Sequence, residues 1–365
     1  MSKEELIINL GPQYLHSQGL LKLIAVCDSE VLKKIEPVIG YSHKGIEKIS
    51  EELTYMQYRP ITAKISPNSS YMYQTAFCHA IEKLCNINVP EKARFIRILM
   101  MELNRIYSHL CWIGNYLLDL GNVLPSKACF PLCESILNIF EKITGQRYSC
   151  EYIIFGGVKK DIDIETLDLI SQITEEIAEN LSILNDLITN NPVFISRTAN
   201  IGILTPQTAL NYSITGVNLR ASGIGLDFRK NDDTYKELSF EIPLRKAGDS
   251  YDRFVLRTEE ISQSIKIVLQ CLEKIKNTNS VFNADINQIE LIPENKQITT
   301  YIESSNGLLA CTVFSNGTNK PQRVKWRTPS FYSVQILPVL LKNRYITDIM
   351  TILGSLDISM PEADR

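Results

Sequence analysis

Cysteine and histidine have the most specific chemistry of the side chains in this sequence, and their spacing argues against a metal site. The chain has nine cysteines and four histidines. Cys129 and Cys133 stand four residues apart in a stretch with helical spacing, and no second cysteine or histidine pair lies at a zinc-like distance. Cys78 and His79 are adjacent, so on a helix they point about 100° apart and make a poor chelate. We therefore predict that the chain binds no metal and that Cys129 and Cys133 pack as small buried residues.

His16 and Asp119 are the strongest candidates for acid–base chemistry. His16 lies in a loop bounded by Pro12 and Gly19, and site residues concentrate in such loops. The other three histidines fit hydrogen-bonded structural roles. Asp119 stands among three leucines, and a carboxylate in such apolar surroundings needs a partner or a proton. A structural pairing and a functional role both remain open for Asp119.

Charge and composition exclude several classes of protein. The 38 Lys and Arg nearly balance the 41 Asp and Glu, so no summed field favours nucleic acid or an anionic membrane surface. The nine cysteines lack the paired spacing of a disulfide framework, and nothing like a signal peptide is present, which favours a reducing compartment. Charged residues interrupt every long apolar stretch well before about 18 residues, so no segment is expected to span a membrane.

The apolar spacing predicts long helices that would position these residues. Residues 95–120 carry apolar side chains at steps of three and four, which predicts a helix of about 30 residues and roughly 45 Å. The same pattern predicts helices over residues 69–84, 128–144, 163–190 and 249–275. The four longest of these suggest a mostly helical core.

Both ends of the chain have patterns typical of small antiparallel sheets. Three short apolar runs near the amino end are separated by glycine and proline, and three near the carboxyl end by the turn signals Asn306-Gly307 and Asn316-Gly317. The predicted strands cover residues 6–9, 20–27, 31–39, 299–303, 308–314 and 323–326. A further strand is predicted at residues 238–242, a polar connector at 277–297 and a last helix at 346–353.

Together these elements predict an α+β fold that is mostly α, with a core of long helices and small N-terminal and C-terminal β-sheets. We expect an N-terminal β-rich region over residues 1–65, a helical core over 66–280 and a C-terminal β/α region over 281–365. The last eighteen residues alternate apolar side chains with Asp and Glu, whereas chain ends usually fray into disposable polar residues. This tail is therefore predicted to turn inward and be buried or bound.

A set of short segments, in the same order along nearly the whole chain, resembles the 49-kDa-type subunit of respiratory complex I. This protein is also called the D subunit or subunit 7, and the resemblance is closest to the H subunit of NAD(P)H:plastoquinone oxidoreductases. The matching segments are residues 9–13, 36–48, 93–97, 102–105, 108–110, 119–121, 156–158, 219–223, 227–230, 248–253 and the tail.

The resemblance implies a peripheral-arm subunit of a proton-translocating NAD(P)H:quinone oxidoreductase. Such a subunit sits where the hydrophilic arm meets the membrane arm and forms the quinone-reduction chamber with a small iron–sulfur subunit and a quinone-site membrane subunit. Its fold is similar to the large subunit of nickel–iron hydrogenases, but the metal-binding Cys-x-x-Cys pairs of those enzymes are missing here, which disfavours hydrogenase activity. The 4Fe-4S cluster, FMN and NAD(P)H would belong to partner subunits, and this chain would bind quinone as substrate and no cofactor.

The same resemblance implies a location and an active-site loop. The chain would lie on an energy-transducing membrane, on the stromal, matrix or cytoplasmic side of a thylakoid, mitochondrial inner or bacterial plasma membrane. In the family the first loop carries two histidines, where this sequence has Tyr14 and Gln18, and a headgroup tyrosine aligns with Pro67. A glutamine amide donates a hydrogen bond but is no proton source near neutral pH. We therefore predict that His16 or Tyr14 supplies the proton.

Three further positions follow from the resemblance. Lys44 and Lys64 stand where the family has arginines near the terminal iron–sulfur cluster; a lysine keeps the positive charge but loses the planar fork of donors. Asp119 matches the carboxylate that pairs with the quinone-site histidine, so it is expected to lie near Gln18. The competing interpretation is a catalytically degenerate paralogue that serves as a scaffold for assembly.

Overall fold

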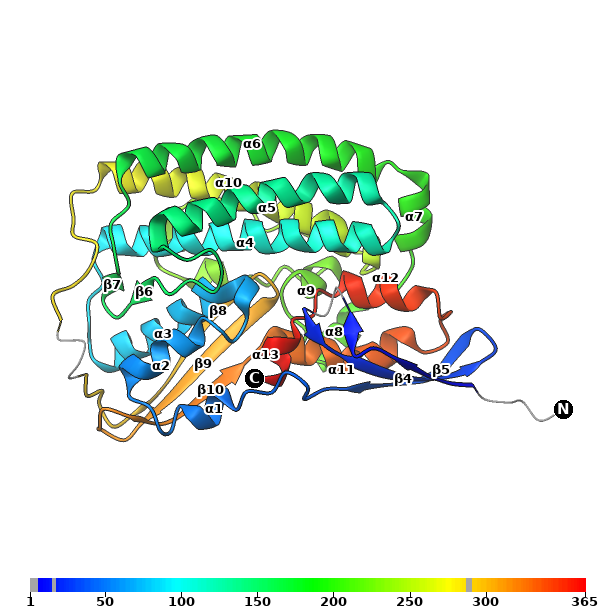
Figure 1. Cartoon of the computed structure of the whole chain (residues 1–365), viewed down its shortest axis with the longest axis horizontal. Coiled ribbons are helices and arrows are strands. Elements are labelled where there is room, and N and C mark those ends of the chain that lie inside the picture. Colours follow the sequence, from blue (N-terminus) through cyan, green and yellow to red (C-terminus); the bar gives the residue numbers. More distant parts are fainter. Residues whose placement is uncertain (1–5, 15–17, 287–290) are drawn as a thin grey trace.

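The chain forms a layer of long helices over a layer of small sheets and short helices. In the computed structural model, which describes residues 6–14, 18–286 and 291–365, the upper layer contains α4 (Glu91–Asp119), α5 (Val123–Thr144), α6 (Ile164–Thr189) and α10 (Ser250–Asn277) (Figure 1). Helix α4 packs against α5 and α10, and α6 packs against the same two helices. The predicted helical core is therefore confirmed.

The N-terminal sheet lies under the carboxyl-terminal helices. Its antiparallel strands β1 (Leu6–Leu10), β4 (Lys22–Asp28) and β5 (Val31–Val38) are ordered β1-β4-β5. Alternate residues of β4 are buried, because successive side chains of a strand point to opposite faces of the sheet. The sheet packs against α11 (Pro329–Leu341). A separate pair of two-residue strands, β2 (Gln13–Tyr14) and β3 (Gly19–Leu20), is antiparallel and flanks the first loop in the sequence.

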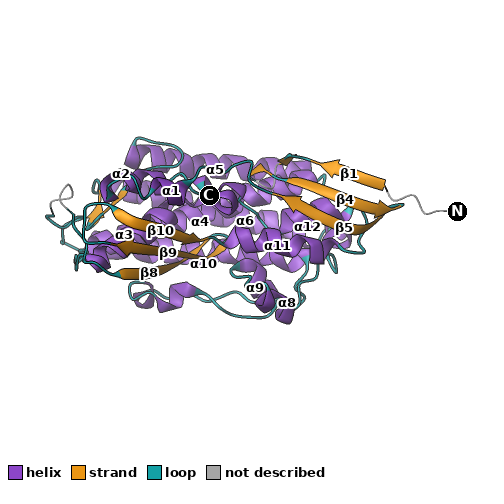
Figure 2. Ribbon diagram, turned by 90° about the horizontal axis from the view of Figure 1, so that it is seen from below, coloured by secondary structure: helices purple, strands orange, loops and turns teal. Residues whose placement is uncertain are grey.

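The C-terminal sheet lies under the other end of the long helices. Strands β8 (Gln297–Ser304), β9 (Gly307–Ser315) and β10 (Pro321–Arg327) are antiparallel in the order β10-β9-β8, and α3 (Ser70–Leu84) packs on β8 and β9. From below, the carboxyl terminus lies between the two sheets (Figure 2). The tail therefore enters the molecule where its two β-regions meet.

Short elements connect these layers. They are α1 (Ile46–Ile49), α2 (Tyr55–Thr62), η2 (Pro67–Ser69), β6 (Ile153–Ile154), β7 (Gly157–Val158), α7 (Pro192–Thr198), α8 (Pro206–Asn211), α9 (Val217–Ala221), η3 (Phe228–Asn231), η4 (Tyr235–Glu237), α12 (Asp348–Ser355) and α13 (Met360–Asp364). The buried apolar residues form a large cluster under the long helices and a smaller one between the N-terminal sheet and α11 to α13.

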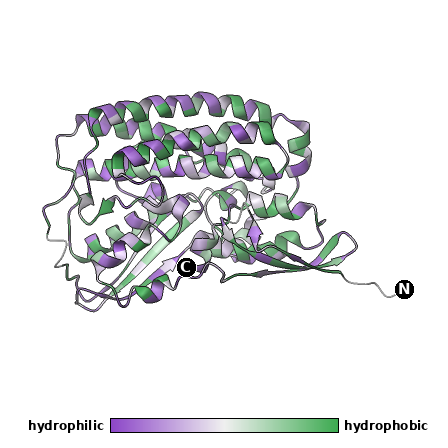
Figure 3. Ribbon diagram, viewed as in Figure 1, coloured by the Kyte–Doolittle hydropathy of each residue, from purple (hydrophilic) through white to green (hydrophobic). Residues whose placement is uncertain are grey.

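Helix α6 shows how the sequence pattern sets the outer surface. Its buried residues recur every three or four positions, and the remaining positions face outward, where hydrophilic residues predominate along the helix (Figure 3). The capping side chain of Asp163 accepts a hydrogen bond from the Thr166 amide at 2.7 Å, which fixes its first turn. No helix in the described part of the chain is both long enough and apolar enough to cross a bilayer.

The fold class is confirmed as α+β and mostly α, but helix α11 was not predicted, and a predicted strand and a predicted helix start are wrong. The expected strand at 238–242 is extended chain whose backbone is paired by side chains of α10: the Ser239 amide donates to Gln270 Oε1 at 2.8 Å and the Glu241 amide to Gln263 Oε1 at 3.1 Å. Helix α5 begins five residues before the expected start, because a proline in the first turn of a helix is tolerated.

Candidate functional site

The tail is held along α4 before it reaches the first loop. The Trp112 indole Nε1 donates to the Gly354 carbonyl at 2.7 Å, and the Tyr116 hydroxyl donates to the Thr351 carbonyl at 3.2 Å. These contacts fix α12 against the carboxyl-terminal half of α4. The chain that leaves α12 is therefore positioned by the longest helix of the molecule.

The last residues close back onto the segment that follows the N-terminal sheet. The Asp364 carboxylate accepts hydrogen bonds from the Gly40 amide at 2.9 Å and the Ser42 amide at 2.8 Å, while Glu362 accepts from the Tyr73 hydroxyl at 2.7 Å. Residues 351–360 are all buried. The prediction of an inward, bound tail is confirmed, and its acidic residues are the groups that bind.

The first loop and the tail meet at a buried carboxylate. Gln18 Nε2 donates to Asp357 Oδ1 at 3.3 Å, and Asp357 Oδ2 lies 3.7 Å from Arg257 Nε on α10. Asp357 is only 1% exposed. A Cβ added at Gly19 would lie 2.9 Å from Cβ of Met360, so loop and tail backbones are in close contact. We call these five residues, Gln18, Gly19, Arg257, Asp357 and Met360, the loop–tail junction.

Two residues of the junction have strained backbones. Gln18 has φ 41° and Asp357 has φ 53°, both in the left-handed region that non-glycine residues rarely adopt. Each costs on the order of 1 kcal/mol, and such residues persist where the surrounding structure holds them. Their side chains contact each other, so the strain is concentrated at one polar contact, which is a common property of functional sites.

The arginine of the junction is deeply buried. Its guanidinium carbon lies 4.1 Å from the centre of the Trp112 ring, and Nη1 donates to the Arg253 and Ser355 carbonyls at 2.9 and 3.1 Å. Burial lowers the pKa of Arg257, although the charge of Asp357 opposes this effect. The ion pair therefore stands in a water-poor environment, where electrostatic interactions are strong.

Further buried ionisable groups continue from Arg257 under the long helices. Glu260 accepts a hydrogen bond from His109 Nε2 at 3.1 Å and pairs with Arg220, which also pairs with Glu303 at 2.8 Å. Burial lowers the pKa of His109 to about 4, so its imidazole is neutral at pH 7. Burial and the nearby charge of Asp227 raise the pKa of Glu303.

Lys44 and Lys64, two of the residues predicted from the sequence, lie next to each other. Lys44 Nζ donates to the Lys64 carbonyl at 3.1 Å, and both side chains are exposed. Burial of part of its surface, followed by the charge of Lys64, lowers the pKa of Lys44. The result is a small positive surface just before the segment that leads to Pro67.

The other predicted site residues lie on separate segments of the chain. Pro67 begins η2, and its crevice against Tyr107 and Tyr148 has a volume of only about 10 Å³. Asp119 is the half-buried last residue of α4, about 12 Å of helix rise beyond residue 111. Tyr14 pairs through its backbone with Gly19, and its side chain and the whole of His16 lie outside the described residues.

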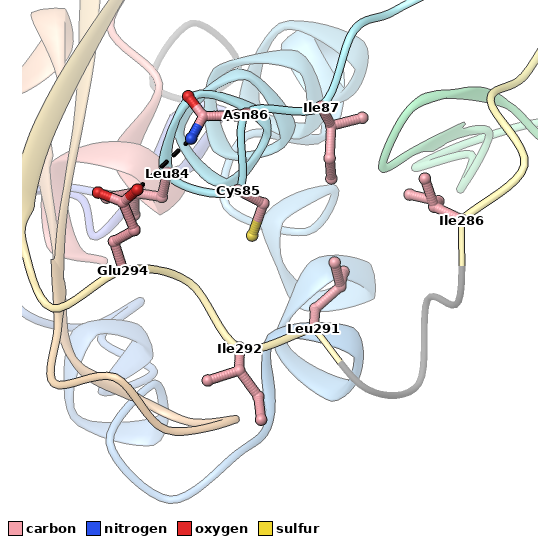
Figure 4. A pocket seen from close by; sticks show the side chains of 8 residues that line it. All are labelled: Leu84, Cys85, Asn86, Ile87, Ile286, Leu291, Ile292 and Glu294. Carbon is pink, nitrogen blue, oxygen red and sulfur yellow. Dashed lines mark hydrogen bonds between the residues drawn. The ribbon is translucent and has the colours of Figure 1, made fainter.

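Other parts of the surface offer weaker candidates. Among the described residues, no group of three or more His, Cys, Asp or Glu side chains is arranged to hold a metal ion. A cavity of about 380 Å³ lies beyond the end of α3 (Figure 4), and in its mostly apolar lining Asn86 Nδ2 donates to Glu294 Oε1 at 3.5 Å. This lining shares no residue with the junction and presents little that could do chemistry.

Sequence comparison decides what kind of protein carries this junction. The model of the family described as respiratory-chain NADH dehydrogenase, 49 Kd subunit, matches residues 119–296 and 286–365. The chain belongs to this family. It is 38% identical over 363 residues to the D subunit of the NADH-quinone oxidoreductase of Bacillus thuringiensis (strain Al Hakam) and of Bacillus anthracis, and 37% identical to that of Bacillus mycoides (strain KBAB4). In each case the match covers 99% of both chains.

Membership of this family makes the chain a subunit of an NADH-quinone oxidoreductase, with other subunits of that complex as partners. Within the family framework the junction adds two residues that sequence reasoning missed, Asp357 and Arg257. The signal for Asp357 was the unusual acidic tail itself. Arg257 lies in the second turn of a long helix and gave no separate signal.

Proposed function

We propose that the chain forms one wall of the quinone-reduction chamber of the complex, and that the loop–tail junction positions the first loop against the quinone headgroup. The observation that carries this proposal is the contact of Gln18 with the buried pair of Asp357 and Arg257. It fixes the end of the loop through a charged group that is excluded from water. A preorganised polar contact of this kind supports catalysis because it needs no rearrangement when charge develops.

Reduction of a quinone takes two electrons and two protons, so the chamber needs both hydrogen-bond donors and a proton source. An amide nitrogen has two hydrogens, so the Gln18 Nε2 that donates to Asp357 has another hydrogen for a quinone carbonyl. It cannot supply the proton itself. We assign that role to His16 or Tyr14, with Asp119, at the carboxyl end of α4, as the carboxylate that stabilises the charged donor.

The electrons would arrive from a 4Fe-4S cluster in the small iron–sulfur subunit, beside Lys44 and Lys64. Two lysines so close together, with Lys44 bound to the Lys64 carbonyl, place positive charge at one point of the surface. Positive charge near a cluster stabilises its reduced form and raises its potential. FMN and NAD(P)H belong to other subunits in this proposal, and plastoquinone as acceptor follows only from the resemblance to H subunits.

An apolar end of the helix layer fits the quinone-site membrane subunit. Around the turn between α4 and α5, Val123 and Leu124 are 45% and 81% exposed, and Val193 is 66% exposed across a cleft of about 200 Å³. Exposed apolar side chains that cluster in this way mark an interaction surface. Docking there would attach the chain peripherally to a bacterial, mitochondrial or thylakoid membrane, close to Asp119.

The test is quinone reduction by the purified complex carrying Gln18→Ala, His16→Ala or Tyr14→Phe. Turnover should fall by on the order of 10²-fold for the variant that loses the proton donor, which is the usual contribution of general acid catalysis. Gln207→Ala, at an exposed amide of α8, is the matched control and should leave turnover unchanged. If none of the three loop variants alters turnover in a fully assembled complex, the assignment of chemistry to this loop fails.

The alternative, a scaffold paralogue without quinone chemistry, is favoured by one observation. The crevice beside Pro67 is nearly filled, with Tyr148 Oη donating to Asn68 Oδ1 at 2.7 Å. A headgroup could not enter there without displacing these side chains. Normal assembly of the complex together with unchanged turnover in every loop variant would support the scaffold.

A further inference from the structure

We propose that Cys111 and Cys133 form a reactive dithiol pair, which closes to a disulfide between α4 and α5 when the protein meets a hydroperoxide. Both cysteines are free thiols in the structure. They lie on two packed helices of the upper layer, one on each (Figure 1). The modification does not depend on the proposed quinone chemistry.

The register of α4 and α5 places the two sulfurs at the same level. The helices run antiparallel, joined by a short turn (Figure 1). Gly114 of α4 lies against Cys129 of α5, since a Cβ added at Gly114 would be 3.3 Å from Cβ of Cys129. Moving from this contact three residues back on α4 and four forward on α5 covers about 4.5 and 6 Å of helix and leads to positions 111 and 133, so these cysteines lie at nearly the same level. Further along the pair, the rings of Tyr107 and Phe140 are 6.5 Å apart.

The helices are also close enough at this level for a covalent link. A Cβ added at Gly114 would lie 3.2 Å from the ring of Phe130 and 3.3 Å from Cβ of Cys129, so the α4 backbone rests directly on α5. A disulfide needs Cα atoms about 4.4–6.8 Å apart, a separation that closely packed helices reach where their facing residues are small. Cys111 and Cys133 are one turn from this closest contact.

The two thiols differ in reactivity in a way that suits a peroxide reaction. The interaction between them lowers the pKa of Cys111 and raises the pKa of Cys133. Asn115 Nδ2 also donates to Cys111 Sγ at 3.8 Å, and Cys111 is partly exposed whereas Cys133 is buried. The thiolate is the nucleophilic form, so Cys111 is the attacking residue and Cys133 the resolving residue.

The reaction with hydrogen peroxide is balanced and needs no group from another subunit. The Cys111 thiolate attacks one oxygen of hydrogen peroxide, the O–O bond breaks, and hydroxide leaves as a sulfenic acid forms. The Cys133 sulfur then attacks the Cys111 sulfur, the S–O bond breaks, and water leaves with the Cys133 proton as the disulfide forms. The two sulfurs lose two electrons in total, and the peroxide gains them.

The position of Cys111 gives this modification a consequence for the loop–tail junction. Cys111 directly precedes Trp112, which binds the Gly354 carbonyl and lies against Arg257, and the charge of Asp357 acts on the Cys111 thiol. A disulfide would remove the ionisable thiol of Cys111, on which the charge of Asp357 acts. It would also hold against α5 the part of α4 that binds the tail. The dithiol pair therefore links the presence of peroxide to the part of α4 that holds the tail.

The experiment is peroxide treatment of the assembled complex, followed by alkylation of remaining thiols, digestion without reduction and mass spectrometry. A linked peptide pair containing Cys111 and Cys133, lighter by two hydrogens, is expected before any other cysteine is oxidised. Thiol labelling of Cys111 should fall about tenfold or more under the same conditions. In the Cys133→Ser variant the link should vanish, and a sulfenic acid at Cys111 should react with dimedone.

Cys129 provides the matched control, since it lies one turn from Cys133 on the same helix and burial raises its pKa to about 12. The Cys129→Ser variant should form the Cys111–Cys133 link at the original rate. A link from Cys111 to Cys129 in the unmodified sequence, or alkylation of Cys111 that peroxide does not slow, would overturn the proposal. Thermal unfolding of each variant shows that a lost link does not result from a lost fold.

Discussion

The sharpest test of the docked tail is the removal of the Glu362 carboxylate. Glu362 is fully buried, and it accepts hydrogen bonds from the Tyr73 hydroxyl at 2.7 Å and the Ser330 amide at 2.9 Å. In Glu362→Ala both donors are left in the protein interior without this acceptor. Each buried donor stripped of its partner costs about 1–3 kcal/mol, so the free energy of unfolding should fall by roughly 2–6 kcal/mol.

Glu362→Gln is the matched control, because it keeps the shape of the side chain and the acceptor for Ser330. Rotation of the Tyr73 hydroxyl allows that oxygen to accept from the new amide, so the expected loss is about 1 kcal/mol. The assay is urea unfolding followed by tryptophan fluorescence, which is sensitive here because the Tyr73 and Trp326 rings are 5.3 Å apart. If Ala and Gln variants agree within about 0.5 kcal/mol, the tail does not depend on these hydrogen bonds.

The same pair of variants has a pH signature. Burial raises the pKa of Glu362, although the hydrogen bonds from Ser330 and Tyr73 oppose the effect. The folded state therefore holds the proton more tightly than the unfolded state, and stability falls as pH rises from the ordinary glutamate pKa through the raised one. The Gln variant lacks this loss, so its stability relative to the original chain should increase over that interval.

Three other perturbations test separate parts of the structure. Gly19→Ala should destabilise the chain by about 1–3 kcal/mol in urea unfolding, because its φ is 151° and the new Cβ would lie 2.9 Å from the tail. In the control Gly225→Ala the new Cβ has no contact closer than 3.8 Å, so its effect on stability should be close to zero. Burial lowers the pKa of His109 to about 4, so His109 adds about 3 kcal/mol to the free energy of unfolding above about pH 6.5, and this contribution is lost as pH falls toward about 4. His109→Gln should remove this pH dependence. A pH series of unfolding curves that matches the original chain would contradict this. Lys44→Met should lower the potential of the neighbouring iron–sulfur cluster in a redox titration of the complex, and Lys48→Met, at an exposed lysine of α1, should not.

The periodic elements were predictable because burial of one face imposes a period on the sequence. Steps of three and four over residues 95–120 were sufficient for α4, and the short apolar run at residues 20–27, bounded by turn residues, was sufficient for β4. Helix α11 was missed because most of its residues are apolar and it contains Pro338, so it shows no polar face. The strand predicted at 238–242 was wrong because glutamines of α10 pair its backbone, and no local pattern reveals such a partner.

The site was predictable only in part. The acidic tail indicated that carboxylates would be bound, and the loop around Gln18 was recognised from its glycine and proline boundaries. The contact between Gln18 and Asp357 joins residues 339 positions apart, and neither propensity nor spacing specifies such a pair. Arg257 is equally hidden, since an arginine on a helix looks the same in a sequence whether it is exposed or buried.

The position of the tail has a consequence for the order of folding. The carboxylates of Asp364 and Glu362 bind Gly40, Ser42 and Tyr73, so these contacts join residues 289 to 324 positions apart. Contacts between segments so distant along the chain form slowly, because the entropy of closing a long loop is lost before the contact contributes. Docking of the tail is therefore expected to be one of the last steps of folding.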